Sequence, residues 1–359
     1  MIGYRRVVRP LLFRYGGGDA ERVHEATLRV IAATGSTTPG RRLLSMISSR
    51  PRTPVTVAGV DFPGLVGLAA GMDKDGVAVA SWAALGFAHA ELGTVTAHPQ
   101  PGNDRPRLVR LPASGGLVNR MGFNNAGATA LASRLAAAGV RRGNGAVGMP
   151  LGISIGKTKI TPLAEATQDY LTSLRLLTPY ADYVAVNVSS PNTAGLRSLQ
   201  DAETLAELVR ALVAAADGVP IFVKIAPDLA PGALDEVVGV AEDNGAGGLV
   251  VANTTLSRDG VRADERVLAD QAGGLSGAPL TRRARGVVGR VAARSRLPVI
   301  GVGGVMTAAD AQALLDLGAR LVQVYTGYVF AGPELVSAIN RHCRPWPRPQ
   351  PSPDPQETT

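Results

Sequence analysis

Short apolar runs alternate with longer amphipathic stretches along most of this chain. From residue 65 onward, each run is rich in Val, Leu, Ile and Ala and ends at Gly, Asn, Thr or Lys. The stretches between the runs repeat apolar residues every three or four positions, which is typical of helices packed on a buried sheet. Helices are expected, for example, at residues 202–216, 231–244 and 308–317. The expected strands are residues 65–68, 88–92, 147–153, 183–187, 221–224, 248–252, 299–301 and 321–324.

Eight strand and helix units over roughly 250 residues are the usual content of a closed barrel. The predicted fold is therefore α/β, a (β/α)8 TIM barrel within residues 53–343. Residues 54–62 predict a short hairpin that covers the barrel floor. Residues 1–52 predict an N-terminal extension of amphipathic helices. Residues 344–359 have proline at nearly every second position and predict an extended, disordered tail.

The composition is that of one globular catalytic domain with short extensions. Of the 359 residues, 45% are hydrophobic, which is enough to bury a full core. The single cysteine, Cys343, excludes a disulfide framework and any iron–sulfur or cysteine-rich zinc site built from this chain alone, and no metal site is expected. No apolar run approaches the length of a membrane span and the first residues do not resemble a secretory signal, so we expect a cytoplasmic protein.

Positive charge is concentrated at the N-terminus. Residues 1–52 contain ten arginines and three acidic residues, which accounts for nearly all of the net charge of +8. Leu11, Phe13, Val30 and Ile31 lie among these arginines, a pattern that favours helices on an anionic membrane surface. A nucleic-acid patch and a solvated helical cap on the barrel are the alternatives.

Polar residues gather just after the expected strands, where a barrel carries its chemistry. Lys74 follows the first strand in AAGMDKDG, as a ligand-binding cation or a solvated turn residue. The amides of NRMGFNN (119–125) suit a small planar ligand with several carbonyl groups, although asparagine also forms turns. In VNVSSPNT, Ser190 stands between two asparagines beside a proline. With no nearby histidine in the sequence and no G-x-S-x-G motif, it is predicted to carry a proton in an oxidation.

The later loops predict a phosphate-bearing cofactor. GGLSG (273–277), GVGG (301–304) and VYTG (324–327) offer backbone N–H groups where barrels commonly bind phosphate. Lys224 ends the fifth strand, either beside an anionic ring or as a structural residue, and ANTT (252–255) ends the sixth.

Together, these ordered motifs resemble the dihydroorotate dehydrogenase family from about residue 4 to residue 340. The quinone-reducing, membrane-associated class fits best, because its members have a basic N-terminal helical pair and use serine where the soluble class uses cysteine. The resemblance implies FMN-dependent oxidation of (S)-dihydroorotate to orotate by a membrane quinone in de novo pyrimidine biosynthesis. It makes Ser190 the base that takes a proton from C5 while hydride leaves C6. It also implies a monomer on the cytoplasmic face of the cell membrane, with no nucleic-acid partner.

The resemblance assigns three sets of residues. The substrate set is Lys74, Asn119, Arg120, Met121, Gly122, Phe123, Asn187, Asn192, Asn253 and Thr254. The FMN set is Ala70, Gly71, Met72, Asp73, Lys74, Thr94, Ser154, Asn187, Lys224, Ala252, Gly277, Gly304, Tyr325 and Thr326. The quinone set is His24, Arg110 and Tyr325. Ser154 replaces an asparagine of many relatives and Ala252 a frequent threonine, so each change removes a hydrogen bond to FMN unless water replaces it.

Two other functions remain open from the sequence. An FMN barrel that reduces uridines in tRNA would also be basic, but such enzymes generally use a cysteine acid, and Cys343 lies just before the tail. The other is a membrane-docked scaffold that has kept a barrel without activity, for which a yellow, flavin-containing protein would be contrary evidence.

Overall fold

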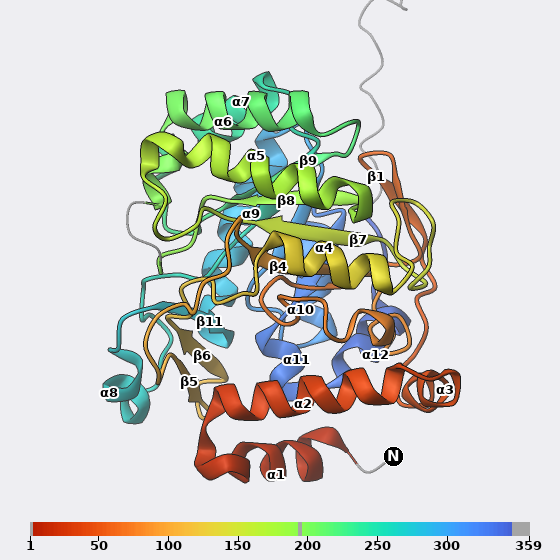
Figure 1. The fold of residues 1–359 in the computed structure, drawn as a ribbon. Helices are drawn as coiled ribbons and strands as arrows, with labels where there is room; N and C mark the ends of the chain where they lie inside the picture. The colour runs from red at the N-terminus through yellow and green to blue at the C-terminus, as the bar shows by residue number, and fades with distance from the viewer. Residues whose placement is uncertain (1–2, 193–195, 347–359) are drawn as a thin grey trace, which may run out of the picture.

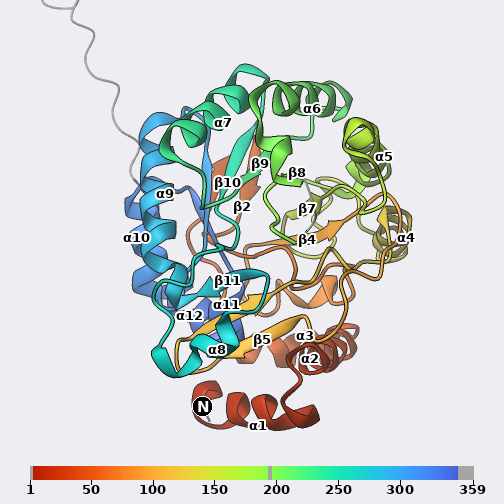
Figure 2. The same cartoon turned by 90° about the vertical axis from the view of Figure 1, so that its left-hand side faces the viewer.

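Eight parallel strands close into a barrel surrounded by helices in the computed structural model, which describes residues 3–192 and 196–346 (Figures 1 and 2). The strand order around the barrel is β10-β12-β13-β3-β4-β7-β8-β9. The predicted (β/α)8 fold is confirmed. The strands are β3 (Val66–Leu68), β4 (His89–Val95), β7 (Leu151–Ile155), β8 (Tyr183–Asn187), β9 (Ile221–Ile225), β10 (Gly248–Val251), β12 (Val299–Val302) and β13 (Leu321–Val324).

Two strand boundaries differ from the expected ones by three residues or more, and the others agree within two residues. The third barrel strand was expected from residue 147 but begins at Leu151, because Gly148 adopts a φ of 79° and Pro150 has no N–H to donate to a ladder. The second was expected to end at residue 92 but continues to Val95, since Gly93 stays within the strand.

The three helices singled out from the sequence each end one residue earlier than expected. They are α6 (Ala202–Ala215), α7 (Pro231–Asp243) and α10 (Ala308–Asp316). The other helices around the barrel are α4 (Ala128–Ala137), α5 (Ala166–Leu177), α9 (Thr281–Arg294), α11 (Thr326–Ala331) and α12 (Pro333–His342), and the short α8 (Arg266–Ala269) lies beside β5.

At the N-terminal ends of the strands, the barrel interior is filled by aromatic side chains. A Cβ atom on Gly67 would lie 2.0 Å from the His89 ring, and one on Gly152 would lie 2.0 Å from the Tyr183 ring, so these two glycines make room for the rings. Below them lies the hairpin of β1 (Val55–Val57) and β2 (Val60–Phe62), whose Phe62 ring packs 5.2 Å from the His89 ring. The predicted hairpin is confirmed and closes the barrel floor.

A three-stranded antiparallel sheet stands outside the barrel and was not expected. It consists of β5 (Leu108–Leu111), β6 (Gly116–Asn119) and β11 (Gly274–Gly277), with β6 in the middle. Its register places Asn119 opposite Gly274, a residue from the far side of the sequence. The sheet therefore joins the two loops that flank the barrel mouth.

The N-terminal segment is helical, as expected. It contains η1 (Tyr4–Val8), α1 (Arg9–Arg14), η2 (Tyr15–Gly18), α2 (Ala20–Gly35) and α3 (Thr38–Met46), and it lies along one side of the barrel (Figure 1). Asp19 caps α2 by accepting hydrogen bonds from the backbone of Glu21 and Arg22, and α2 packs against β5. Within residues 3–192 and 196–346, no helix is long and apolar enough to cross a membrane. Most of the predicted tail, from residue 347, lies outside the described residues.

Candidate active site

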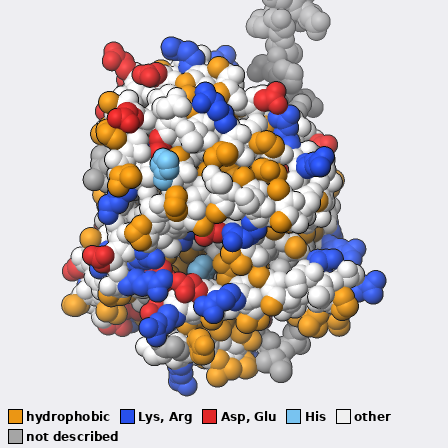
Figure 3. Space-filling view, in the orientation of Figure 1, with side chains coloured by type: hydrophobic (Ala, Val, Ile, Leu, Met, Phe, Trp, Pro, Cys, Tyr) orange, Lys and Arg blue, Asp and Glu red, His pale blue; other side chains and the backbone are white. Residues whose placement is uncertain are grey.

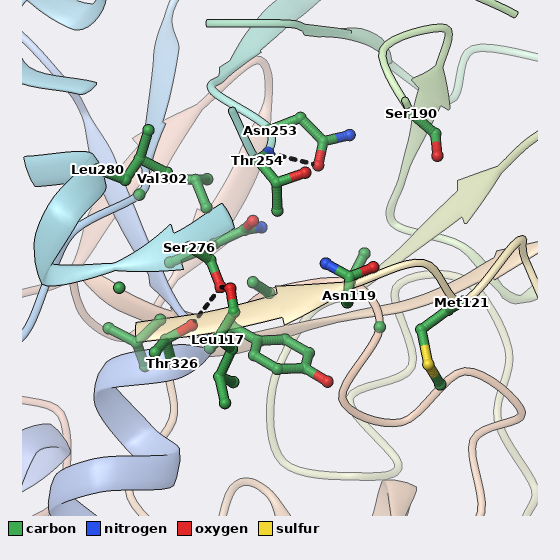
Figure 4. A pocket seen from close by; sticks show the side chains of 18 of the residues that line it. Leu117, Asn119, Met121, Ser190, Asn253, Thr254, Ser276, Leu280, Val302 and Thr326 are labelled. Atoms are coloured by element: carbon green, nitrogen blue, oxygen red, sulfur yellow. Dashed lines mark hydrogen bonds between the residues drawn. The ribbon is translucent and has the colours of Figure 1, made fainter. Parts of the chain in front are cut away.

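A cavity of about 1070 Å3, including the part open to solvent, lies at the carboxyl ends of the barrel strands against β5, β6 and β11. Figure 4 shows Ser190, Asn119 and Asn253 around the same open space, although they come from separate segments of the chain. The cavity gathers most of the residues predicted from sequence. They are Ala70, Gly71, Lys74, Thr94, Asn119, Met121, Gly122, Phe123, Asn187, Ser190, Asn192, Asn253, Thr254, Gly277, Gly304, Tyr325 and Thr326.

Several predicted residues lie behind or beside this lining. The Asp73 carboxylate accepts hydrogen bonds from the backbone of Val77 and Ala78 and from the Trp82 indole, so it holds a turn of the chain. Arg120 donates to the carbonyl of Pro106 at the surface. The remaining predicted residues outside the lining are Met72, Ser154, Lys224, Ala252, His24 and Arg110.

Ser190 presents a buried hydroxyl to the cavity (Figure 4). Its Oγ accepts a hydrogen bond from the backbone N–H of Asn192 at 3.2 Å, and Pro191 stiffens the loop between the two residues. Among the described residues, this hydroxyl has no hydrogen bond to a histidine or a carboxylate. A hydrolytic triad is therefore absent from the described site.

The asparagine amides of the lining are oriented by one another and by hydroxyl groups. Asn192 donates to Asn119 Oδ1 at 3.1 Å, and Asn187 donates to Thr94 Oγ1 at 2.9 Å. Asn253 donates to Asn187 Oδ1 at 3.3 Å and to the Ser189 hydroxyl at 2.9 Å. These bonds fix which edge of each amide is free to bind a ligand.

Ser154 lies outside the lining and is connected to it through Thr94. Their hydroxyl groups share a hydrogen bond of 2.8 Å, and Thr94 is also the acceptor for Asn187. The Ser154 hydroxyl therefore supports the cavity wall from behind.

Lys74 is a charged residue of the cavity lining, and its pKa depends on burial and on residues of α2. Burial lowers the pKa of Lys74 to about 8, against the opposing effect of Glu21. Burial also lowers the pKa of His24 to about 4, and the positive charge of Lys74 adds to this shift. Burial raises the pKa of Tyr325 to about 12, and the charge of Glu21 adds to it. At neutral pH Lys74 is therefore a cation, whereas His24 and Tyr325 are neutral.

The other predicted quinone residue, Arg110, lies at the outer side of this group. Its guanidinium carbon is 4.5 Å from the centre of the Phe13 ring and it donates a hydrogen bond to the carbonyl of Gly18. Phe13 in turn packs edge-on against Phe330 at 5.4 Å. The three predicted quinone residues are thus divided between the cavity, where Tyr325 lies, and its side toward α1 and α2.

A buried ion pair ties α2 to the loop before β5. Glu21 accepts hydrogen bonds from the Arg107 guanidinium at 2.8 to 3.1 Å, and both side chains are 5% exposed. Arg107 also donates to the carbonyls of Pro101 and Asn103. The Asn103 amide then donates to the backbone oxygen of Asn192 at 3.3 Å, so the ion pair is connected to the Ser190 loop.

The far end of the cavity is formed by backbone-rich loops. A Cβ atom on Gly277 would lie 2.2 Å from the Gly115 carbonyl oxygen, and one on Gly304 would lie 2.3 Å from the Thr281 backbone. The hydroxyl groups of Ser276 and Thr326 share a hydrogen bond of 2.8 Å between these loops (Figure 4). This end has the close backbone packing and hydroxyl groups of a phosphate site.

Sequence reasoning missed part of the lining. Ser276, Gly303 and Gly327 belonged to quoted motifs but were not singled out, whereas the apolar residues carried no signal of their own. The missed residues are Ala69, Leu108, Leu117, Pro191, Ser276, Leu280, Val302, Gly303, Val305, Met306, Gln323, Val324 and Gly327.

Residues 53–344 match the sequence model of the family described as dihydroorotate dehydrogenase. This match covers well over half of the chain. The chain belongs to the dihydroorotate dehydrogenase family. The family resemblance seen in the sequence is therefore confirmed.

Individual members of the family are similar over nearly the whole chain. A dihydroorotate dehydrogenase (quinone) of Salinispora arenicola is 54% identical over 349 residues, covering 95% of this chain and 99% of the relative. One from Chloroflexus aurantiacus is 51% identical over 352 residues, covering 94% and 95%. A crystal structure of DHODH in complex with ferulenol from Eimeria tenella superposes with a TM-score of 0.82 at 29% identity, covering 95% of this chain and 94% of the other. This chain is an oxidoreductase of that family.

Proposed function

We propose that this enzyme oxidises (S)-dihydroorotate to orotate with FMN as cofactor and a membrane quinone as the final electron acceptor, in de novo pyrimidine biosynthesis. The printed names of the relatives support the substrate and the acceptor. The observation that carries the proposal is the buried Ser190 hydroxyl, which faces the same cavity as Asn119 and Asn253.

The residues of the cavity fit FMN. Gln323 lines the cavity, and its buried Oε1 atom has no hydrogen-bond partner among the described residues, so it suits an N–H donor such as the ring imide of a flavin. The loops of Gly277, Gly304 and Thr326 would hold the phosphate. When bound, the flavin supplies a two-electron acceptor for hydride that later passes the electrons to quinone.

The substrate set matches the chemistry of dihydroorotate. Its carboxylate would pair with the Lys74 ammonium, while its ring carbonyl and N–H groups would bind the amides of Asn119, Asn192 and Asn253. Because these amides are already oriented by hydrogen bonds, little reorganisation is needed on binding.

Ser190 would carry the proton of the reaction. Oxidation breaks the C6–H bond as hydride and the C5–H bond as a proton, and the electron pair left at C5 forms the C5=C6 double bond. A serine of ordinary acidity is a weak base, so its hydroxyl accepts the C5 proton as it passes its own to water or to a neighbouring hydroxyl group. The two electrons and two protons finally convert quinone to quinol.

The N-terminal helices would dock on an anionic membrane. Leu11 is 65% exposed, Val30 66% and Met46 75%, and arginines surround them along α1, α2 and α3. Figure 3 shows hydrophobic and basic side chains together on this lower part of the molecule. Quinone would enter between α1 and α2, pass His24 and Arg110, and reach Tyr325, which lines the cavity.

The alternative function, reduction of uridines in tRNA, lacks support because no cysteine that could act as its acid lies at this cavity. Cys343 is buried at the end of α12, donates to the Ala308 carbonyl at 3.4 Å and lies outside the lining.

The proposal is tested by mixing the purified, flavin-containing enzyme with dihydroorotate without oxygen. We expect flavin absorbance to bleach within one turnover and to return when a long-chain quinone is added. Equal turnover with fumarate or NAD⁺ would contradict the quinone assignment. A colourless protein that binds no FMN would contradict the cofactor.

A further inference from the structure

Four buried polar side chains meet at the floor of the cavity, and the proposed reaction assigns no role to Glu91 or Tyr183. Glu91, Tyr183, Lys224 and Gln323 come from β4, β8, β9 and β13, and none is more than 5% exposed. Since β4 is not a neighbour of β9 or β13 in the barrel, these side chains meet across its interior. A charged residue at such a depth is rare unless it is paired.

Glu91 is the centre of this group. Its Oε1 accepts a hydrogen bond from Lys224 Nζ at 3.1 Å, and its Oε2 accepts one from Gln323 Nε2 at 2.9 Å. Tyr183 donates to Oε2 at 3.4 Å and accepts from Gln323 Nε2 at 3.1 Å. Glu91 is the anion of the group and Lys224 is its cation, so each offsets the buried charge of the other.

The group determines what the cavity floor presents to a ligand. Both N–H bonds of the Gln323 amide are used within the group, which leaves its Oε1 as the unpartnered acceptor at the cavity. The Lys224 ammonium binds the same Glu91 carboxylate as the amide of Gln323, a lining residue, so the ammonium lies close to the cavity floor. Without Glu91, the ammonium would lose its counter-charge and the amide would lose a bond that fixes its orientation.

We propose that Glu91 is a positioning residue that sets the reduction potential of the bound flavin through Lys224 and Gln323. This inference rests on the proposed function, because it requires a flavin over the cavity floor. Reduction adds electron density to the ring, and a nearby ammonium favours the reduced form. Glu91 offsets part of that positive charge and so keeps the potential lower than Lys224 alone would set it.

The test is the midpoint potential of the flavin in Glu91→Gln, measured against a reference dye without oxygen. Removal of the negative charge should favour the reduced over the oxidised flavin by at least tenfold, which raises the potential by about 30 mV for a two-electron couple. Asp169→Asn is the matched control. Asp169 is a buried carboxylate on α5, outside the barrel, that accepts from Thr158 N and the Thr161 hydroxyl. The midpoint potential of the flavin in Asp169→Asn should equal that in the wild type.

A second variant covers the case in which the uncompensated Lys224 prevents folding or flavin binding. Glu91→Gln with Lys224→Gln removes both charges, so that no unpaired ion is buried. Its potential should fall below the wild-type value, because the ammonium beside the ring is gone.

The proposal is overturned if Glu91→Gln retains flavin at the wild-type potential, or if Asp169→Asn shifts the potential equally. A wild-type potential in the double variant overturns it as well. A wild-type enzyme that contains no flavin would instead contradict the proposed function, so the two failures are distinguishable.

Discussion

Replacement of Glu21 by glutamine should destabilise the whole enzyme although it changes only an N-terminal helix. The substitution removes the anion that pairs with Arg107, and both side chains are 5% exposed in the folded chain. Loss of one partner leaves the other charge buried without compensation, which costs about 3–5 kcal/mol. We therefore expect the free energy of unfolding to fall by about that amount.

Glu25→Gln is the matched control on the same helix. Glu25 pairs with Arg105 at 2.6 Å, but the two side chains are 40% and 50% exposed. Pairs at this exposure contribute about 0–1 kcal/mol, because water solvates either charge when the partner is removed. The two substitutions are chemically identical and both remove a contact with Arg105, but only Glu21 also has the buried contact with Arg107.

The pH dependence gives an independent test of the same ion pair. Burial raises the pKa of Glu21, but the hydrogen bond and charge of Arg107, together with the charges of Arg105 and Lys74, outweigh it and leave the pKa below its usual value of 4.5. A carboxyl group with a lowered pKa stabilises the fold at pH values above its pKa in the unfolded chain. This stabilisation is lost as the pH falls through its pKa in the folded chain. The wild type should therefore lose stability below about pH 4.5 more steeply than Glu21→Gln.

Urea denaturation followed by intrinsic fluorescence, repeated between pH 3 and pH 7, measures both effects. Equal losses of stability in Glu21→Gln and Glu25→Gln would show that burial of the pair has no energetic consequence. If the free energy of unfolding fell equally steeply with decreasing pH in Glu21→Gln and in the wild type, the lowered pKa of Glu21 would be refuted.

The remaining predictions concern catalysis and binding. Ser190→Ala should keep its flavin but slow flavin reduction by dihydroorotate by roughly 10²–10⁴, whereas a cysteine there should retain part of the rate; stopped-flow reduction at wild-type speed would refute the base. Asn119→Ala and Asn192→Ala should each weaken orotate binding by about 1–3 kcal/mol in calorimetric titration, and unchanged affinity in both would place the substrate elsewhere. Orotate affinity should fall as the pH rises through about 8, where Lys74 loses its proton, and a Lys74→Gln variant with the same pH profile would contradict this. Removal of residues 1–18 should weaken co-sedimentation with anionic liposomes, because each basic residue near such a surface contributes about 1 kcal/mol of attraction; added salt should weaken binding of the full-length enzyme, and undiminished binding of the shortened enzyme would refute the docking face.

The barrel could be predicted because parallel strands buried on both faces must be continuous apolar runs, which stand out in a single sequence. The polar residues that follow those runs also converge for a geometric reason, since all carboxyl ends meet at one rim. Lys74, Asn187, Ser190 and Asn253 are therefore found together in the cavity.

Other parts depend on pairings that the local sequence does not encode. β6 and β11 are short, contain glycine and lie far apart in the chain, so no periodicity could show that Asn119 pairs with Gly274. Glu91 lies inside an apolar strand, where its charge was a signal of a buried partner, but the identity of that partner depends on which strands face each other across the barrel. Asp73 followed a correctly located strand, and only its turn geometry shows that its carboxylate binds the backbone.

The Glu21 and Arg107 pair also changes where the catalytic unit begins. A cut just before Asp19 leaves both the cap of α2 and the counter-ion of Arg107 in place, whereas a cut after Gly35 strands a guanidinium inside the protein. A buried arginine of the catalytic domain is thus neutralised by a glutamate of the segment that we propose to dock on the membrane. We therefore expect α2 and the charge at the position of Arg107 to be gained or lost together among family members, which a comparison of their sequences would test.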